Sequence, residues 1–144
     1  SFQWNNASRY CQTYCNSHLG SIHNEQNYED VIDQIEMNTY TIDKVWIGLN
    51  DILEPDTYEW TDGTSLNFAN KMDSNGHIRR GSYPWASDRP TPSAISNDKC
   101  VAIDVDTNLW TDRGEWHAHN FICNGCNGKI SKYAAITGEY EHWP

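Results

Sequence analysis

The five cysteines, Cys11, Cys15, Cys100, Cys123 and Cys126, are the residues with the most specific chemistry in this 144-residue chain. Thiols at this density in a small domain are typical of disulfide-bonded proteins from an oxidising, extracellular environment. A zinc ribbon is the alternative, because Cys123 and Cys126 have the spacing of half its ligand set. The other half is missing, since Cys11 and Cys15 are spaced to share one face of a helix. We therefore expect disulfides.

Other side chains could bind metal ions. His117 and His119 lie two apart, on one face of an extended segment, and could hold Zn²⁺, but a third ligand is not evident. Asp104, Asp106 and Asn108 occupy alternate positions, yet they lack the Gly and the distant Glu of an EF-hand. We interpret these last three residues as a turn.

The basic residues are unevenly distributed. Of the ten, five fall within or at the end of residues 65–99, and a sixth, Arg113, follows the next pair of strands; the five are Lys71, Arg79, Arg80, Arg89 and Lys99. Guanidinium groups pair well with sulfate, phosphate or carboxylate, so this segment suggests an anionic ligand. The alternative is that these cations offset local acids such as Asp73 and Asp88.

The net charge of −10 argues against nucleic acid and anionic membranes as partners. No segment approaches the roughly 20 apolar residues that span a bilayer. No Ser/His/Asp ordering, phosphate-binding glycine loop or pair of carboxylates points to an enzyme. Asn6-Ala7-Ser8 is an N-glycosylation sequon, which predicts a secreted glycoprotein modified at Asn6.

Two apolar segments predict the centre of the fold that positions these groups. The run Val45-Trp46-Ile47-Gly48-Leu49 is continuously apolar, as in a buried strand, and its Gly48 indicates that another backbone packs closely. Tyr58 and Trp60 share one face of a second strand, which stops at Thr61-Asp62-Gly63. We expect these two strands to form the central hairpin of a small mixed domain.

Two helices are expected before this hairpin. Residues 4–18 repeat apolar side chains with helical spacing. Asn24 is the expected N-cap of a second helix, whose apolar stripe contains Tyr28, Val31, Ile32 and Ile35. Residues 65–99 lack helix and strand patterns, and loops this long are usually functional or disordered. Strands follow at 100–105, 109–110 and 120–123.

The order of these elements resembles the C-type lectin-like domain over residues 4–123. The resemblance implies an α+β fold with two helices, small antiparallel sheets and a long ligand-binding loop. The matching positions, in chain order, are Tyr10-Cys11, His18-Leu19, Ser21-Ile22, Val45 to Leu49, Trp60-Thr61-Asp62-Gly63, Cys100-Val101, Trp110-x-Asp112 and Phe121-Ile122-Cys123.

By this resemblance, Cys11 of the first helix bonds Cys123 of the last strand. The family's second bridge would start at Cys100, but the partner expected shortly after Trp110 is missing. Cys15 and Cys126 each lie a few residues beyond a member of the first bridge, so we expect them to form the second. Cys100 is then expected to be a buried free thiol, with a bridge to a second chain as the alternative.

Sugar-binding members of the family hold Ca²⁺ with a Glu-Pro-Asn or Gln-Pro-Asp triplet, an acidic residue before the strand Cys, and a Trp-Asn-Asp motif. Here Arg89-Pro90-Thr91, Asp98 and Trp110-Thr111-Asp112 occupy these places. Because a guanidinium repels the metal, we expect the calcium site to be lost, with Asp98 and Asp112 as the remaining candidate ligands. Glu54-Pro55-Asp56 is similar to the triplet, but it lies between two strands and is interpreted as a turn.

Family members begin with a strand that pairs with the closing strand, whereas this chain is expected to begin at the helix. Asn127-Gly128 predicts a hairpin, followed by a strand over residues 130–136. We expect residues 1–126 to form the domain and the tail, residues 127–144, to supply the first strand in a permuted or displaced arrangement. Exchange of the tail between two molecules, or a bridge through Cys100, would give a homodimer.

The expected function is extracellular recognition rather than catalysis. The partner is expected to be a glycan, an anionic one included, bound through the long loop without a cofactor. The alternative is a calcium-independent protein-binding, structural or signalling domain without sugar affinity. The residues expected to contact the ligand are Arg79, Arg80, Trp85, Arg89, Thr91, Asp98, Thr111, Asp112 and Arg113.

Overall fold

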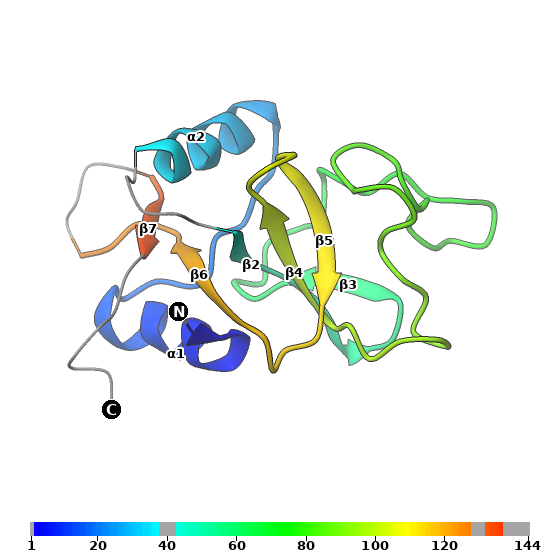
Figure 1. The fold of residues 1–144 in the computed structure, drawn as a ribbon, viewed down its shortest axis with the longest axis horizontal. Helices are drawn as coiled ribbons and strands as arrows, with labels where there is room; N and C mark the ends of the chain where they lie inside the picture. Colours follow the sequence, from blue (N-terminus) through cyan, green and yellow to red (C-terminus); the bar gives the residue numbers. More distant parts are fainter. Residues whose placement is uncertain (1, 38–42, 128–131, 137–144) are drawn as a thin grey trace.

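The computed structural model describes residues 2–37, 43–127 and 132–136. A mixed sheet forms the centre, and its strands follow the order β1-β6-β2-β4-β5, with β3 paired to β2 and β7 paired to β6 (Figure 1). The strands are β1 (Phe2–Gln3), β2 (Lys44–Glu54), β3 (Thr57–Trp60), β4 (Cys100–Asp104), β5 (Leu109–Arg113), β6 (Ala118–Cys123) and β7 (Ala134–Ile136). The predicted central hairpin, β2 with β3, and the α+β fold class are confirmed.

Two helices, α1 (Trp4–Tyr14) and α2 (Glu25–Glu36), pack on this sheet. Asn24 caps α2 as predicted, because its side chain accepts a hydrogen bond from the Asn27 N–H at 2.8 Å. Helix α1 ends before the predicted His18, since Asn16 adopts a left-handed conformation with φ of 52°. No described helix is long and apolar enough to cross a membrane.

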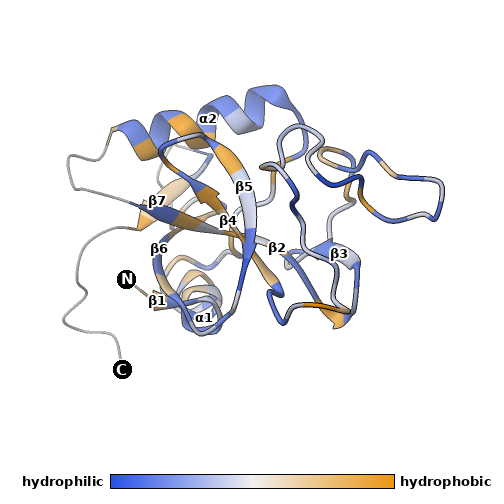
Figure 2. Ribbon diagram, turned by 45° about the vertical axis from the view of Figure 1, so that its right-hand side comes forward, coloured by the Kyte–Doolittle hydropathy of each residue, from blue (hydrophilic) through white to orange (hydrophobic). Residues whose placement is uncertain are grey.

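The core consists of two clusters of buried side chains. One joins α2 residues such as Tyr28 and Val31 to four tryptophan and tyrosine side chains of the sheet and the long loop, which are Tyr58, Trp60, Trp85 and Trp110. The other joins α1 to Phe2, Trp46 and Phe121. Figure 2 shows hydrophobic residues on the central strands and hydrophilic residues over the outer surface of α2. Aromatic side chains therefore supply much of the packing.

Gly48 on β2 has the close backbone neighbour that the sequence predicts. Its N–H donates to the Gly20 carbonyl at 2.9 Å, and a Cβ at this position would lie 2.9 Å from the Leu19 carbonyl oxygen. A side chain here would push the segment after α1 away from the sheet.

Both predicted disulfides are confirmed: Cys11 bonds Cys123, and Cys15 bonds Cys126. They link α1 to β6 and to the turn after it. Cys100 is a free thiol with 0% exposure at the start of β4. Such burial contradicts the alternative of a Cys100 bridge to a second chain, because the sulfur does not reach the surface.

The chain ends differ in part from the prediction. A short strand, β1, precedes α1, so the prediction that the chain begins at the helix is wrong. The tail does pair antiparallel with β6, as Phe121 opposite Ile136 and Cys123 opposite Ala134. This partner is β6 of the same chain. Because both β1 and β7 pair with β6, the structure does not show a permutation. Ile130 and Gly128 lie outside the described residues.

Candidate functional site

Backbone hydrogen bonds attach the long loop, residues 65–99, to the sheet, and one buried indole joins two parts of the loop to each other. Residues 65–99 contain isolated bridge pairs but no helix or strand element. Trp110 of β5 donates its N–H to the Pro84 carbonyl and accepts one from Ala86, each at 2.8 Å. Trp85 is 2% exposed, and its indole N–H donates to the Ala69 carbonyl at 3.2 Å. The prediction that Trp85 contacts a ligand is therefore corrected: it packs in the core.

The far end of the long loop is held by the turn between β2 and β3. Asp56 accepts hydrogen bonds from the Ser93 N–H at 2.9 Å and from the Ser93 hydroxyl at 2.7 Å. Burial opposes ionisation of Asp56, but these bonds from Ser93 outweigh it and lower the pKa of the carboxyl. Asp56 donates its own N–H to Asp51. The Glu54-Pro55-Asp56 triplet is thus a turn, as interpreted from the sequence, and also a support for the long loop.

Arg89 occupies the centre of the region where the resemblance places a calcium ion. One guanidinium nitrogen, Nη1, donates to the Asp112 main-chain oxygen at 3.0 Å and to Asp112 Oδ1 at 3.2 Å. The same atom lies 3.7 Å from Asp98 Oδ2. Thr91 completes the set, since its N–H donates to Asp112 Oδ2 at 2.8 Å and its hydroxyl donates to Asp112 Oδ1 at 3.5 Å. Both carboxylates predicted as candidate metal ligands are therefore paired with one cation.

Five of the predicted residues, Arg89 and four around it, lie together, but they differ in exposure. Thr111 is 8% exposed and Asp112 is fully buried, so neither presents side-chain surface to a ligand. Arg89, Thr91 and Asp98 are half-buried. Thr111 and Asp112 therefore support the loop from below. Within the described residues, no group of three or more His, Cys, Asp or Glu side chains could hold a metal ion.

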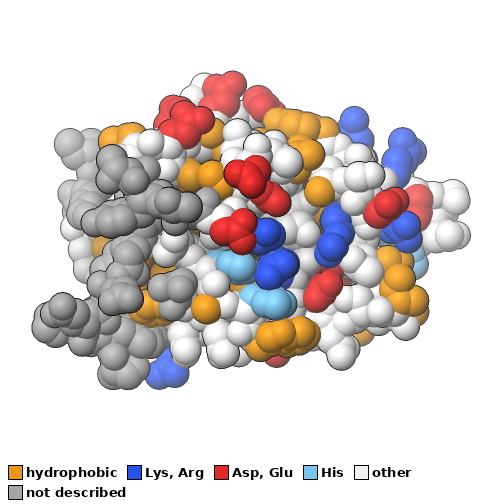
Figure 3. Space-filling model, viewed as in Figure 1, with side chains coloured by type: hydrophobic (Ala, Val, Ile, Leu, Met, Phe, Trp, Pro, Cys, Tyr) orange, Lys and Arg blue, Asp and Glu red, His pale blue; other side chains and the backbone are white. Residues whose placement is uncertain are grey.

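The other three predicted arginines do not join this cluster. Arg113 donates from Nε to His119 Nε2 at 2.9 Å, on β6. Arg80 lies 3.7 Å from the exposed Asp88 carboxylate. Figure 3 shows basic and acidic side chains interspersed on the loop side of the molecule. The alternative prediction, that cations of the loop offset local acids, thus holds for Arg80 and Arg89.

The two histidines that could bind zinc stack on each other instead. Their ring centroids lie 6.2 Å apart at an interplanar angle of 21°. Burial, together with the neighbouring Arg113, lowers the pKa of His119 to about 4. His119 is therefore neutral at physiological pH, with Nε2 accepting from Arg113.

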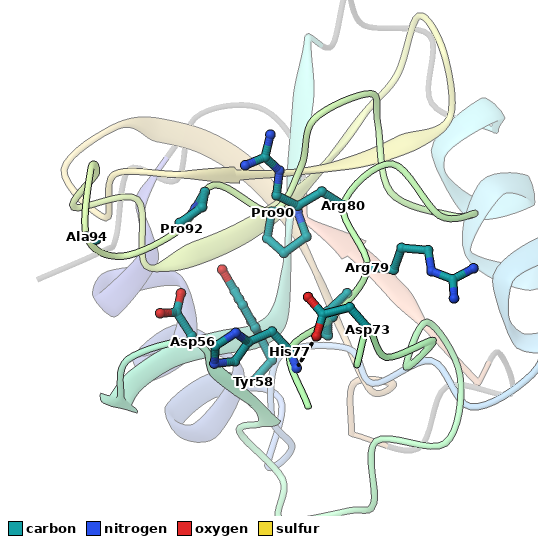
Figure 4. A pocket seen from close by; sticks show the side chains of 10 residues that line it. Asp56, Tyr58, Asp73, His77, Arg79, Arg80, Pro90, Pro92 and Ala94 are labelled. Atoms are coloured by element: carbon teal, nitrogen blue, oxygen red, sulfur yellow. Dashed lines mark hydrogen bonds between the residues drawn. The ribbon is translucent and has the colours of Figure 1, made fainter. Parts of the chain in front are cut away.

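A cavity of about 490 Å³ opens between the long loop and β3. Its lining includes Asp56, Tyr58, Asp73, His77, Pro90 and Pro92 (Figure 4). Arg79 and Arg80 lie at its edge, and their guanidinium groups point away from its centre. The sequence predicts a strand position for Tyr58 and a turn at Asp56, and no spacing pattern links these residues to His77 or Pro90. Only the path of the long loop brings them together.

The fold and the arrangement of the loop are those of a known family. The profile of the Lectin C-type domain matches residues 1–125, so the chain belongs to the C-type lectin domain family. This family is non-enzymatic, which confirms the prediction that the chain is not an enzyme. Disulfide-bonded domains of this type are typical of extracellular proteins.

Individual proteins are similar to this chain in sequence or in fold. The chain is 28% identical over 123 residues to a lectoxin, a C-type lectin of Thrasops jacksonii, covering 83% of this chain and 68% of that protein. Human lithostathine has the same fold, with a TM-score of 0.64 at 18% identity over 94% of this chain and 81% of that one. A calcium-independent type II antifreeze protein has a TM-score of 0.57 at 24% identity, covering 82% of this chain and 74% of that one.

Proposed function

We propose that this domain is a secreted recognition module that binds glycans through the long-loop face without calcium. The observation that supports the proposal is the position of Arg89. Its guanidinium contacts Asp98 and Asp112, the two acidic positions that would serve as calcium ligands in sugar-binding relatives. The guanidinium offsets the charge of these two carboxylates in place of a metal ion, and it repels a metal ion that approaches them. Asn6 on α1 is the proposed glycosylation site.

The proposal includes anionic glycans, because two arginines lie at the edge of the cavity. Arg79 and Arg80 direct their guanidinium groups outward there, where a sulfate or carboxylate substituent could be paired. Arg89 and Thr91 are half-buried and are chain neighbours of Pro90, which lines the cavity. Trp85, Thr111 and Asp112 are not proposed as contacts, because they are buried.

A second candidate function is protein binding, and a groove of about 280 Å³ along α2 favours it. Four carboxylates of α2 line the groove, those of Glu25, Glu29, Asp33 and Glu36, together with apolar surface from Ile32, Leu109 and Tyr83. Figure 3 shows acidic side chains gathered over this helix. A basic protein segment would complement this surface.

A glycan array probed in millimolar calcium and again in EDTA tests the proposal. We expect binding of the same glycans with equal intensity in both buffers. Loss of binding in EDTA would show that a metal is required and would contradict the role given to Arg89. Absence of any glycan binding in either buffer would favour the protein-binding alternative.

A further inference from the structure

The groove along α2 is lined by apolar side chains from three parts of the chain, and its edge is charged. Tyr28 and Ile32 come from α2, Leu109 from β5 and Tyr83 from the long loop. Figure 1 shows the turn between β4 and β5 beside α2. Tyr83 is 51% exposed, so apolar surface of the groove is accessible to a ligand. At about 280 Å³ the groove lies at the lower end of ligand-site sizes, so it holds side chains of a partner rather than a whole segment.

Four carboxylates form the charged edge of this groove. They recur about once per turn of α2 and are all exposed; they belong to Glu25, Glu29, Asp33 and Glu36. None of the four takes part in an ion pair among the described residues. Glu25 accepts a hydrogen bond from the Tyr83 hydroxyl at 2.8 Å, which is a neutral donor. The edge therefore presents uncompensated negative charge to solvent.

This distribution of charge lowers the stability of α2. Glu29 lies four residues from both Glu25 and Asp33, and like charges at this spacing repel each other on one face of a helix. Asp33 and Glu36 lie in the last turn, where the helix macrodipole favours cations, and no basic residue is present in that turn. Cations from a partner would relieve both kinds of repulsion. Charge complementarity therefore favours a basic ligand.

The spacing of the carboxylates distinguishes a basic protein segment from a metal ion. Within the part of the chain that the structure describes, no group of three or more His, Cys, Asp or Glu side chains could hold a metal ion, so these carboxylates do not converge on one point. From Glu25 to Glu36 they extend over about 16 Å of the helix axis. A row of separate cations matches this arrangement, and a second helix presents such a row at every third or fourth residue.

We propose that the groove along α2 binds a basic amphipathic helix of a partner protein, about three turns long. Lys or Arg side chains of that helix pair with the four carboxylates. An apolar side chain between them enters the groove and packs on Ile32, Leu109 and Tyr83. The inference rests on protein binding, the second candidate function, and does not depend on glycan binding.

The chain itself does not supply such a helix. Helix α2 of a second copy is acidic, and α1 contains a single basic residue, Arg9. Residues 137–144 contain Glu139 and Glu141 and no Lys or Arg. The net charge of −10 also opposes self-association through an acidic surface. The proposed occupant is therefore a different, basic protein.

NMR titration of the protein with a synthetic peptide tests this inference. The peptide contains about 16 residues of Ala, Leu and Lys, with Lys at every fourth position and Leu on the adjoining face. A peptide of the same composition, with its Lys spread around the helix, is the comparison. We expect the patterned peptide to bind at least about fivefold more tightly and to shift the amide signals of Glu29, Ile32 and Leu109. Equal affinity of the two peptides would mean attraction by net charge alone and would overturn the assignment.

Glu29→Lys and Asp30→Lys are a matched pair of variants. The two residues are neighbours on α2 and the substitutions change the net charge equally, but only Glu29 lines the groove. We expect Glu29→Lys to weaken binding of the patterned peptide about tenfold or more, because it opposes like charges, and Asp30→Lys to weaken it less than about threefold. Glu29→Lys should melt at least as high as the native protein, since it replaces repulsive pairs on α2 with attractive ones. Equal losses of binding in the two variants would contradict the assignment to this groove.

Tyr83→Ser tests the apolar part of the groove. This substitution removes an aromatic ring that is more than half exposed, and it should weaken binding of the patterned peptide about fivefold. Tyr83→Phe keeps the ring and frees Glu25 from its hydrogen bond, so it should bind the peptide at least as well as the native protein. Unchanged binding in Tyr83→Ser would show that no apolar side chain enters the groove beside this ring and would refute that part of the proposal.

The outcomes separate this inference from the glycan-binding proposal. If the array shows bound glycans and the patterned peptide does not bind at α2, only this inference is overturned. If the peptide binds at α2 and no glycan binds on the array, only the glycan-binding proposal is overturned. A dimer of the protein that Glu29→Lys abolishes would show that a second copy occupies the groove, and it would overturn the assignment to a basic partner.

Discussion

Arg89 and Asp112 form a charge pair in which one partner is fully buried. Removing the cation would leave a buried carboxylate whose partners from the loop are the N–H and the hydroxyl of Thr91. We therefore expect Arg89→Ala to lower the free energy of unfolding by about 2 kcal/mol. Urea unfolding measures this change. Arg80→Ala is the matched control, because Arg80 and Asp88 are both exposed and should contribute less than about 0.5 kcal/mol. Equal effects of the two substitutions would contradict the special role of Arg89.

The opposite change at the same position tests the link to calcium. Arg89→Glu restores an acidic residue beside Pro90 and brings a third carboxylate next to Asp98 and Asp112. We expect this variant to melt well below the native protein in EDTA, since like charges repel, and to recover part of the difference in millimolar calcium. The native protein should show no such calcium response. A calcium-induced rise in the melting temperature of the native protein would refute the pairing described above.

His119 makes stability depend on pH. Its pKa is lowered to about 4 in the folded protein, while a histidine in the unfolded chain titrates near 6.5. Between these values only the unfolded chain binds the proton, so the folded state loses stability as pH falls. The expected loss from pH 7 to pH 5 is about 2 kcal/mol. His119→Gln keeps an acceptor for Arg113 and should flatten this dependence, as measured by urea unfolding at several pH values; an unchanged slope would rule out His119 as its source.

At the level of elements, β1 and β7 together cover one edge of β6, although they are far apart in the sequence. Phe2 pairs with His119 at one end of β6, and Ile136 pairs with Phe121 two residues further on. Both strands run antiparallel to β6, so they follow each other along its edge as two parts of one interrupted strand. Strand β2 lies on the opposite edge, parallel to β6.

This arrangement predicts that β7 is required for stability. A chain ending after Asn127 would lose the β6 pairing, the buried Ile136, and the bond from the Tyr133 hydroxyl to the Ser21 carbonyl at 2.6 Å. We expect its melting temperature to fall by about 10 °C or more, because apolar area and backbone partners are lost together. A chain ending after Ile136 retains all of these contacts and serves as the control. If both truncated chains melt alike, β7 is dispensable.

At the level of the whole molecule, spacing predicted the elements that depend on local pattern, and the resemblance to the C-type lectin-like domain predicted the bridges. The apolar run of β2 and the cap at Asn24 follow from neighbouring residues. The pairing of Cys15 with Cys126 follows from their positions beside the Cys11–Cys123 bridge. Strand β1 was missed because two residues have no periodicity. Trp85 was misplaced because its burial comes from backbone pairing with Trp110, which no local pattern encodes.

At the candidate site, too, residue types were predictive, whereas contacts that depend on the tertiary fold were not. The sequence indicated that Arg89 would disfavour a metal, since charge type alone decides that sign. It did not indicate that the guanidinium bonds Asp98 and Asp112 together, nor that Tyr58 faces a cavity. Both depend on how the long loop folds back over β3, and 35 residues without helix or strand patterns do not specify that path.

The Cys11–Cys123 bridge has a mechanical consequence. Tension applied between residues 2 and 136 would pass from the first turns of α1 through the disulfide directly into the end of β6. Only the segments 2–11 and 123–136 could then lengthen, by about 7 nm, whereas a reduced chain could extend by several times that distance. Every residue of the cavity and of the Arg89 cluster lies on the bypassed part of the chain, so the binding face would keep its shape under load.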